Sequence, residues 1–300
     1  MNKQLKKSLN TENCPHITIE QWGNVNAQDV FLYTLINSSG MEVQLTNYGC
    51  TIVSWKVPDN HGKFENIVLG LSDLDAYLSG HPCFGNIVGR FANRIGDAKF
   101  TLDGVVYPLS ANCGKNHIHG GNHHFGTKVW KVLRTDTNSD SATLSLSYVS
   151  RDMEEGYPGN LIVNLDYTLD NEGCLSLNYT AATDKSTVLN LTNHAYFNLT
   201  GCKENVLNHR VRIYSDSYLP VNIPVDHENI PSGVIRSVEG TPFDLRQWTT
   251  IKDRMQALPR GFDNNYCLHS QEKTLLLASE LFDPQSGRLL QTYTTEPAVV

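Results

Sequence analysis

The chain has 300 residues, of which 40% are hydrophobic and 18% charged, and its formal net charge is −7. This composition is typical of a globular protein with a buried core. It argues against nucleic-acid binding, because the Lys and Arg residues are scattered and form no basic cluster. No apolar run approaches the about 18 residues that a membrane-spanning helix needs.

The seven cysteines give no sign of a disulfide framework or a zinc site. Their number is odd, and no two are spaced as a Cys-x-x-Cys pair. Free thiols are typical of a reducing compartment, and the basic N-terminus lacks the apolar segment of a signal peptide. We therefore expect a cytoplasmic protein.

The first elements predicted along the chain are a short helix and a β-hairpin. Residues 72–78 begin with a serine that can cap a helix. Residues 99–102 and 105–107 flank Asp103-Gly104, and an Asp-Gly pair between two strand-like runs is a strong signal for a tight hairpin turn.

Alternating apolar residues predict three further antiparallel strands, over residues 144–148, 161–169 and 175–179. Clusters of Asn, Asp, Pro and Gly separate these runs. A second short helix is predicted over residues 250–258, where Ile, Met and Leu have helical spacing between a threonine cap and Pro259.

Many strands with few helices favour an all-β fold, a large antiparallel β-sandwich. No linker, repeat or low-complexity tract interrupts the sequence. We therefore expect residues 1–300 to form a single domain.

His194 stands out within residues 189–199, a run that is otherwise typical of a buried strand. An imidazole that exchanges a proton near neutral pH can serve as a general acid or base. Asn193 is placed to orient it, and Tyr196 and Phe197 to line an apolar wall. The alternative is a histidine that is hydrogen-bonded inside a sheet and has no chemical role.

Two further segments carry polar side chains that a sheet does not require. Residues 89–96 contain Arg90 and Arg94, whose donors suit sugar hydroxyls or carboxylates, or a surface salt bridge. Residues 116–124 contain four histidines around a Gly-Gly pair, which fits either a metal site or a tight turn. No cysteine or carboxylate stands at zinc-ligand spacing beside them, so we predict no metal.

Carboxylates mark two segments near the C-terminal end. Asp263 lies beside Phe262, a combination of polar and stacking groups that suits sugars, although the segment is equally suited to a turn. Glu296 is a single carboxylate before a proline, which by itself does not indicate catalysis. Motifs for nucleotide cofactors and serine hydrolases are absent, and we expect no cofactor.

Taken together, these segments resemble the aldose 1-epimerase family, the galactose mutarotases. The matching segments stand in family order: residues 47–55 (NYGCTIVSW), 85–95 (GNIVGRFANRI), 116–121 (NHIHGG), 190–199 (NLTNHAYFNL), 240–244 (GTPFD) and 294–297 (TTEP). Several separate motifs in the right order are far more specific than any one of them.

The resemblance implies a β-sandwich enzyme that needs no cofactor and interconverts the α and β anomers of an aldose such as galactose or glucose. An acid protonates the ring oxygen while a base removes the proton of the anomeric hydroxyl. The ring then opens, the C1–C2 bond rotates, and reclosure gives either anomer. The implied partner is a small aldose, with no nucleic acid or membrane, and the implied protein is a monomer or homodimer.

The resemblance also implies roles for individual residues. His194 is the acid that protonates the ring oxygen, and His119 binds the sugar near that oxygen and helps to orient it. The remaining implied sugar-binding residues are Asn93, Arg94, Tyr196 and Asp263. The other histidines of residues 116–124, which are His117, His123 and His124, gain no sugar role and are expected to be structural or exposed.

Three positions depart from the family pattern. The general base of the family is a glutamate beyond the segment of Glu296, and it has no counterpart among these 300 residues. Val300 stands where a substrate-binding glutamine usually follows, and Asn264 where a histidine is common. We therefore expect a domain that is incomplete at its C-terminal end, folds poorly and has little activity, because one such proton-transfer group is worth about 10²–10⁴-fold in rate.

Two alternatives remain from the sequence. A non-catalytic carbohydrate-binding protein of the same fold would need no base, but it would not explain His194 in its full motif. A hexose-phosphate epimerase of related fold should carry additional basic residues for the phosphate, whereas only Arg90 and Arg94 stand in one candidate segment.

Overall fold

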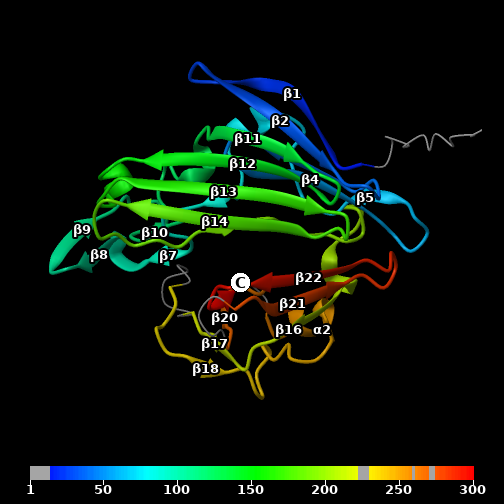
Figure 1. The fold of residues 1–300 in the computed structure, drawn as a ribbon. Helices are drawn as coiled ribbons and strands as arrows, with labels where there is room; N and C mark the ends of the chain where they lie inside the picture. Colours follow the sequence, from blue (N-terminus) through cyan, green and yellow to red (C-terminus); the bar gives the residue numbers. More distant parts are fainter. Residues whose placement is uncertain (1–13, 222–229, 259–260, 270–273) are drawn as a thin grey trace, which may run out of the picture.

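The structure is a computed structural model, and it describes residues 14–221, 230–258, 261–269 and 274–300. Two antiparallel sheets dominate it (Figure 1). The five strands of the first sheet stand in chain order: β1 (His16–Val25), β2 (Gln28–Ile36), β3 (Glu42–Thr46), β4 (Thr51–Pro58) and β5 (Phe64–Asn66). The second sheet contains β11 (Lys131–Thr137), β12 (Ser141–Ser150), β13 (Leu161–Asp170) and β14 (Leu175–Thr183).

The three strands predicted from alternation are confirmed as β12, β13 and β14. The burial of β13 alternates along its whole length, with Leu161, Val163, Leu165 and Tyr167 all buried. Their side chains share one core with Leu35 and other residues of β2, β3 and β4. Because one face of each sheet is apolar, the two sheets pack face to face as a sandwich, which confirms the predicted fold class.

Two further four-stranded sheets follow in the C-terminal third. One has the order β19 (Thr249–Thr250), β16 (Arg210–Ile213), β21 (Leu276–Phe282) and β22 (Leu289–Thr294). The other has the order β18 (Arg236–Ser237), β17 (Ser217–Leu219), β20 (Asn265–Cys267) and β23 (Ala298–Val299). A smaller core that includes Ile213, Tyr218 and Tyr266 joins them.

Three pairs of short strands complete the described sheets. The hairpin predicted around Asp103-Gly104 is confirmed as β8 (Lys99–Leu102) and β9 (Val105–Pro108). The other two pairs are β7 (Arg94–Ile95) with β10 (His117–Ile118) and β6 (Ile87–Val88) with β15 (Thr192–Asn193). The described part of the chain also contains the 3₁₀ turns η2 (Gly96–Ala98), η3 (Phe125–Thr127), η4 (Glu154–Gly156) and η5 (Val206–Asn208).

Both predicted helices exist, but their ends differ from the prediction. The side chain of Asp73, and not that of Ser72, caps α1 (Leu74–Leu78) by accepting from the N–H of Ala76 at 2.9 Å. A carboxylate is the better acceptor at this position because it also complements the helix dipole. The Ser72 hydroxyl instead donates to Asp73 at 2.7 Å.

The second helix, α2 (Ile251–Met255), starts where predicted and stops early. Thr250 makes no side-chain capping bond, since it also belongs to β19 and pairs with Arg210 of β16. The helix ends before Leu258, and Pro259, the predicted stop, lies outside the described residues.

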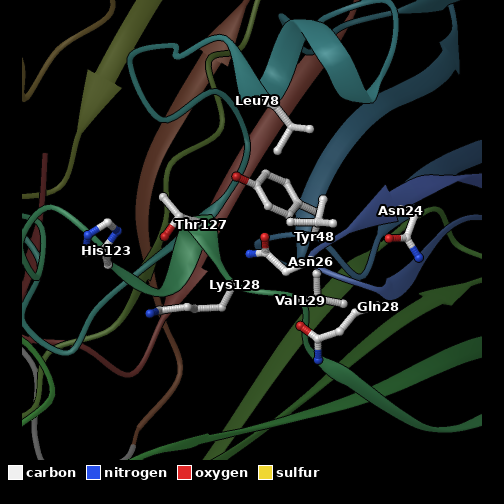
Figure 2. Close-up of a pocket in the computed structure, with 10 residues that line it drawn as sticks. Asn24, Asn26, Gln28, Tyr48, Leu78, His123, Thr127, Lys128 and Val129 are labelled. Carbon is white, nitrogen blue, oxygen red and sulfur yellow. The ribbon is translucent and has the colours of Figure 1, made fainter.

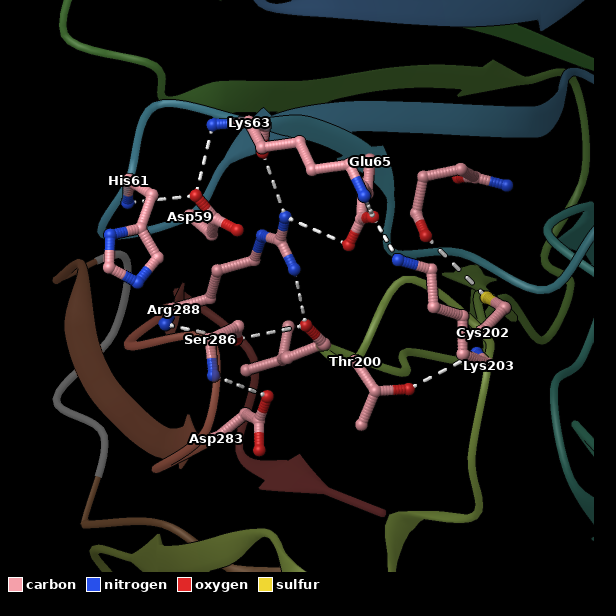
Figure 3. A network of polar contacts seen from close by, with 12 residues as sticks. Asp59, His61, Lys63, Glu65, Thr200, Cys202, Lys203, Asp283, Ser286 and Arg288 are labelled. Atoms are coloured by element: carbon pink, nitrogen blue, oxygen red, sulfur yellow. Dashed lines mark hydrogen bonds and ion pairs between the residues drawn. The ribbon is translucent and has the colours of Figure 1, made fainter.

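A polar network ties the first sheet to the turn between β21 and β22 (Figure 3). The guanidinium of Arg288, which is almost fully buried, donates to the carbonyls of Leu199 at 2.8 Å and Lys63 at 3.0 Å. It also pairs with Glu65 at 3.4 Å, and Glu65 in turn binds Lys203. These contacts join segments that are far apart in sequence.

Candidate functional site

The segment around His194 is not the buried strand that its apolar pattern predicts. Only Thr192–Asn193 forms a strand, and the chain leaves the sheet directly afterwards. The backbone N–H of His194 donates to the carbonyl of Asn86 at 2.9 Å, and its carbonyl accepts from the N–H of Gly85 at 3.0 Å. These bonds fix the backbone of His194 beside β6, while its ring is half-buried.

The side chain of Asn193 orients this backbone, and the bonds that do so go to backbone groups rather than to the His194 ring. Its Nδ2 donates to the Gly85 carbonyl at 2.8 Å, and its Oδ1 accepts from the N–H of Ala195 at 3.0 Å. Such local side-chain bonds compete with strand pairing. They explain why the strand stops at Asn193.

His119 reaches the same place from β10. Its ring meets the ring of His194 edge to face, with centroids 5.1 Å apart and an interplanar angle of 85°. The Nδ1 atom of His119 accepts a hydrogen bond from the backbone N–H of Asn93 at 3.1 Å. Because that N–H can only donate, the neutral ring carries its proton on Nε2 and can donate from there.

Asn93 and His119 are bound to each other in both directions. The N–H of His119 donates to the Asn93 carbonyl at 3.0 Å, next to the pairing of Ile118 with Arg94 between β10 and β7. Both residues have left-handed backbone, with φ of 64° for Asn93 and 53° for His119. This conformation is uncommon outside glycine, and the reciprocal bonds stabilise it.

Arg94 and Asp263 form a polar pair that spans the N-terminal and C-terminal parts of the chain. Nη2 of Arg94 lies 3.4 Å from Oδ2 of Asp263, and Nη1 donates to Oδ1 of Asn93 at 3.2 Å. The Arg94 side chain is 14% exposed and that of Asp263 43% exposed. The arginine side chain is therefore largely buried, and the carboxylate is partly exposed to solvent.

Aromatic rings continue from His194 away from His119. Tyr196 stacks on His194 at 5.1 Å, and the edge of Phe84 meets Tyr196 at 5.0 Å. The hydroxyl of Tyr196 donates to the carbonyl of Pro82 at 3.0 Å. Phe197, predicted to line the same wall, instead packs against Trp55 in the main core.

The electrostatics favour uncharged imidazoles. Burial and, to a lesser degree, the charge of the neighbouring His194 together lower the pKa of His119 to about 3. Burial also lowers the pKa of His194, while a hydrogen bond with its own backbone and the charge of Asp263 act in the opposite direction. His119 is thus a permanent neutral donor, and His194 is the ring whose protonation Asp263 supports.

Sequence reasoning missed the aromatic residues before β6. The ring of His81 stacks on Phe84 at 6.1 Å, and burial lowers the pKa of His81. No motif marks these residues, since their approach to Tyr196 depends on how α1 and the following loop pack. The sequence offered one signal for this aromatic group, which is that Phe84 directly precedes the 85–95 motif.

The other three histidines of residues 116–124 have surroundings that differ from those of His119. His117 is fully buried, with Nδ1 bonded to the Ser110 carbonyl at 2.8 Å. His123 is exposed. His124 accepts from the N–H of Gly126 at 3.1 Å, and burial lowers its pKa to about 4. Among the described residues, no group of three metal-ligating side chains is close enough to hold an ion.

Arg90, the second arginine of its segment, is an interior residue. It is 1% exposed, and its guanidinium donates to the carbonyls of Pro158, Ser150 and Arg151 at 2.7, 3.1 and 2.9 Å and to the Ser150 hydroxyl. Its donors are therefore engaged, and Arg90 cannot serve as a phosphate-binding group. Asn264 is also internal, with its amide donating to the Leu219 carbonyl at 3.1 Å.

The pocket drawn in Figure 2 is a different place. It has a volume of about 550 Å³ and lies between the tip of the β1–β2 hairpin, Tyr48, Leu78 and residues 127–129. Its lining includes none of the six residues implied in sugar binding. No helix in the described part of the chain is long and apolar enough to cross a membrane.

Known proteins share sequence and fold with this chain. The model of the family described as aldose 1-epimerase matches residues 32–300. Galactose mutarotase of Sus scrofa is 42% identical over 269 residues, which cover 88% of this chain and 75% of that protein. Aldose 1-epimerase of Escherichia coli (strain K12) is 33% identical over 279 residues, covering 91% and 78%.

Solved structures show the same similarity. The crystal structure of galactose 1-epimerase from Lactobacillus acidophilus NCFM superposes with a TM-score of 0.78 at 30% identity, covering 90% of this chain and 77% of that one. A GalM/aldose epimerase homologue from C. elegans gives a TM-score of 0.77 at 28% identity, covering 87% and 77%. The chain therefore belongs to the aldose 1-epimerase family.

Proposed function

We propose that this chain is an isomerase that interconverts the α and β anomers of a free aldose such as galactose or glucose. The observation that carries the proposal is the contact of His119 with His194 beside the Arg94–Asp263 pair. Proton donors, a carboxylate and an aromatic wall converge there from segments that are distant in sequence. This combination suits a hexose, which offers several hydroxyls and one ring oxygen.

His194 is the proposed acid for the ring oxygen. Its lowered pKa makes the protonated ring a stronger acid, and the nearby Asp263 keeps protonation accessible. His119 donates from Nε2 and holds the sugar near the ring oxygen. The hydroxyls are bound by Asn93, Arg94 and Asp263, and Tyr196 provides the wall.

Among the described residues, we assign none to take the proton of the anomeric hydroxyl. Glu296 is exposed between β22 and β23, where its backbone N–H donates to the Thr294 hydroxyl at 3.0 Å. Its charge acts on Tyr179, and it is not among the groups that shift the pKa of His194. We therefore propose His194 as the acid and do not propose Glu296 as the base.

Two further features support the assignment. The engaged donors of Arg90 favour an unphosphorylated sugar, because a phosphate needs free arginine or lysine groups. All seven cysteines are unpaired, which suits the reducing cytoplasm.

We also propose that the whole chain acts as one domain, since the Arg288 network joins its early and late segments.

The decisive experiment follows the optical rotation of freshly dissolved α-galactose with and without the protein. We expect an acceleration that His194→Asn abolishes while sugar affinity, measured by calorimetry, stays within about threefold. The full-length His16→Asn variant is the matched control, because His16 is exposed at the start of β1 and lies outside the site. Sugar binding without any acceleration by the unmodified chain would instead identify a non-catalytic sugar-binding protein.

A further inference from the structure

The turn that presents His119 rests on a carboxylate from a distant part of the chain. Glu155, in η4, accepts three hydrogen bonds from the segments around this turn. Its Oε2 accepts from the Ser110 hydroxyl at 2.7 Å and from the N–H of Asn122 at 3.2 Å. Its Oε1 accepts from the N–H of His123 at 2.8 Å.

Two glycines let the turn sit close to this support. A Cβ on Gly120 would lie 1.8 Å from the carbonyl oxygen of Gly89, and a Cβ on Gly121 would lie 2.1 Å from Oε2 of Glu155. The turn is closed by a bond from the N–H of Gly121 to the Ile118 carbonyl at 3.1 Å. The two residues after His119 are thus packed between Gly89, which follows β6, and the Glu155 carboxylate.

Buried polar groups hold the support itself. Nδ1 of His117 donates to the Ser110 carbonyl at 2.8 Å, and its Nε2 accepts from the Tyr157 hydroxyl at 2.6 Å. We name Ser110, His117, Glu155 and Tyr157 the support cluster. Ser110 lies before β10, His117 lies in β10, Glu155 lies in η4 and Tyr157 directly follows it, so the cluster ties these segments together.

Arg90 anchors the same loop from the other side. Its guanidinium binds the carbonyls of Ser150, Arg151 and Pro158, which bracket Glu155 in the sequence. Arg90 also belongs to the segment that carries Asn93 and Arg94. The sugar-binding residues and the loop of Glu155 are therefore held in one rigid arrangement.

We propose that Glu155 is a positioning residue that sets the place of the His119 ring through the turn at Gly120-Gly121. The expected effect of Glu155 on turnover rests on the proposed function, whereas its effect on the position of His119 does not. A carboxylate is required because all three partners donate, and both its oxygens only accept. A carboxamide would point its own N–H₂ at one of these donors, and the turn would move away from it.

The test compares Glu155→Gln with Asp152→Asn in the full chain. Asp152 is the matched control: it accepts from the N–H of Gly159 at 2.6 Å and from Lys185 at 2.9 Å, and it binds no residue of the His119 turn. Histidine labelled with ¹⁵N reports the tautomer of His119, whose signals are identified by their loss in His119→Asn.

We expect the unmodified chain and Asp152→Asn to show His119 protonated on Nε2, and Glu155→Gln to show a mixture of tautomers. We also expect kcat/KM for galactose to fall about 10- to 100-fold in Glu155→Gln alone, because small displacements of a binding group are costly in rate. Glu155→Asp, which keeps the charge, should restore part of both.

An unchanged His119 signal in a folded Glu155→Gln variant would overturn the proposal, whatever its melting temperature. If that variant does not fold, Ser110→Ala removes one of the three donors and should shift the same signal, and no shift would again overturn it. The tautomer needs no turnover to be observed. A shifted signal in a series without any anomerisation would therefore support the role of Glu155 and contradict the proposed function.

Discussion

The negative charge of Asp263 raises the pKa of the His194 ring, which burial otherwise lowers. The same carboxylate pairs with Arg94 at 3.4 Å. One side chain from the C-terminal part thus influences both the proposed acid and a proposed sugar-binding arginine. Several consequences of this arrangement can be measured.

Replacing Asp263 with Asn should lower the pKa of His194 in the free protein. The carboxylate stabilises the protonated ring and so offsets part of the effect of burial on its pKa. Without the carboxylate, the ring is protonated only in a more acidic solution. A pH titration followed by histidine NMR measures the shift. In the anomerisation assay, the decline in rate that reflects loss of the His194 proton should move to lower pH as well.

Asp216→Asn is the control for this titration, because Asp216 also pairs with an arginine, Arg246, at 3.1 Å and does not contribute to the pKa of His194. A titration of His194 that is the same in all three proteins would show that Asp263 has no electrostatic role.

Arg94→Lys should weaken sugar binding with little change in stability. The guanidinium bonds Asn93 and Asp263 through two separate nitrogens in a fixed fork, and the single nitrogen of a lysine ammonium cannot reproduce that spacing. Losing one hydrogen bond to a charged donor costs about 1.5–3 kcal/mol, or roughly a 10- to 150-fold rise in KM. Steady-state kinetics give KM, and Arg134→Lys, in the second sheet, should leave it unchanged.

Gly120→Ala should be far more destabilising than Gly104→Ala. Both glycines have left-handed backbone, with φ of 88° and 78°, so both variants incur the conformational cost of about 1–2 kcal/mol. Only at Gly120 does the new Cβ meet another backbone atom, the Gly89 oxygen at 1.8 Å, whereas nothing lies within 4 Å at Gly104. Urea unfolding measures the difference, and equal losses would contradict the close approach.

Acid should destabilise the protein partly through Glu65. Hydrogen bonds from Lys203 and Lys63 lower the pKa of Glu65 from 4.5 to about 2. Because the folded-state pKa is lowered, this contribution is complete above pH 4.5 and is lost as the pH falls towards 2. Glu65→Gln should therefore flatten the pH dependence of the unfolding free energy in that window.

The control is Glu20→Gln, since Glu20 is exposed on β1. Urea unfolding between pH 2 and 6 makes the comparison. If the slope is the same for Glu65→Gln and the unmodified chain, the ion pairs of Glu65 drawn in Figure 3 contribute nothing to acid stability.

The strands that alternate strictly could be predicted from the sequence, because a period of two fixes which side chains reach the core. β13 shows this along its whole length. The end of the strand at Asn193 could not be predicted, since it depends on side-chain bonds to Gly85, which is far away in the sequence. Periodicity carries no information about such contacts.

The candidate site was predictable where short motifs carry it. His119, His194 and Arg94 stand in such motifs, and the structure brings them together. Glu155 was not predictable, because its role depends on backbone N–H groups that every residue possesses. Phe197 was misplaced for a related reason: the sequence shows an aromatic pair, but only the packing on Trp55 decides which ring faces the core.

The pairing of β15 with β6 has a practical consequence. The exposed turn at residues 138–140 separates the fragment with Asn93 and His119 from the fragment with His194. If the backbone were cleaved there, neither half would contain both imidazoles, yet the interlocking of β6 with β15 and of β11 with β12 would favour reassociation. Two separately expressed halves that are inactive alone and catalyse anomerisation when mixed could then serve as a split reporter of their association.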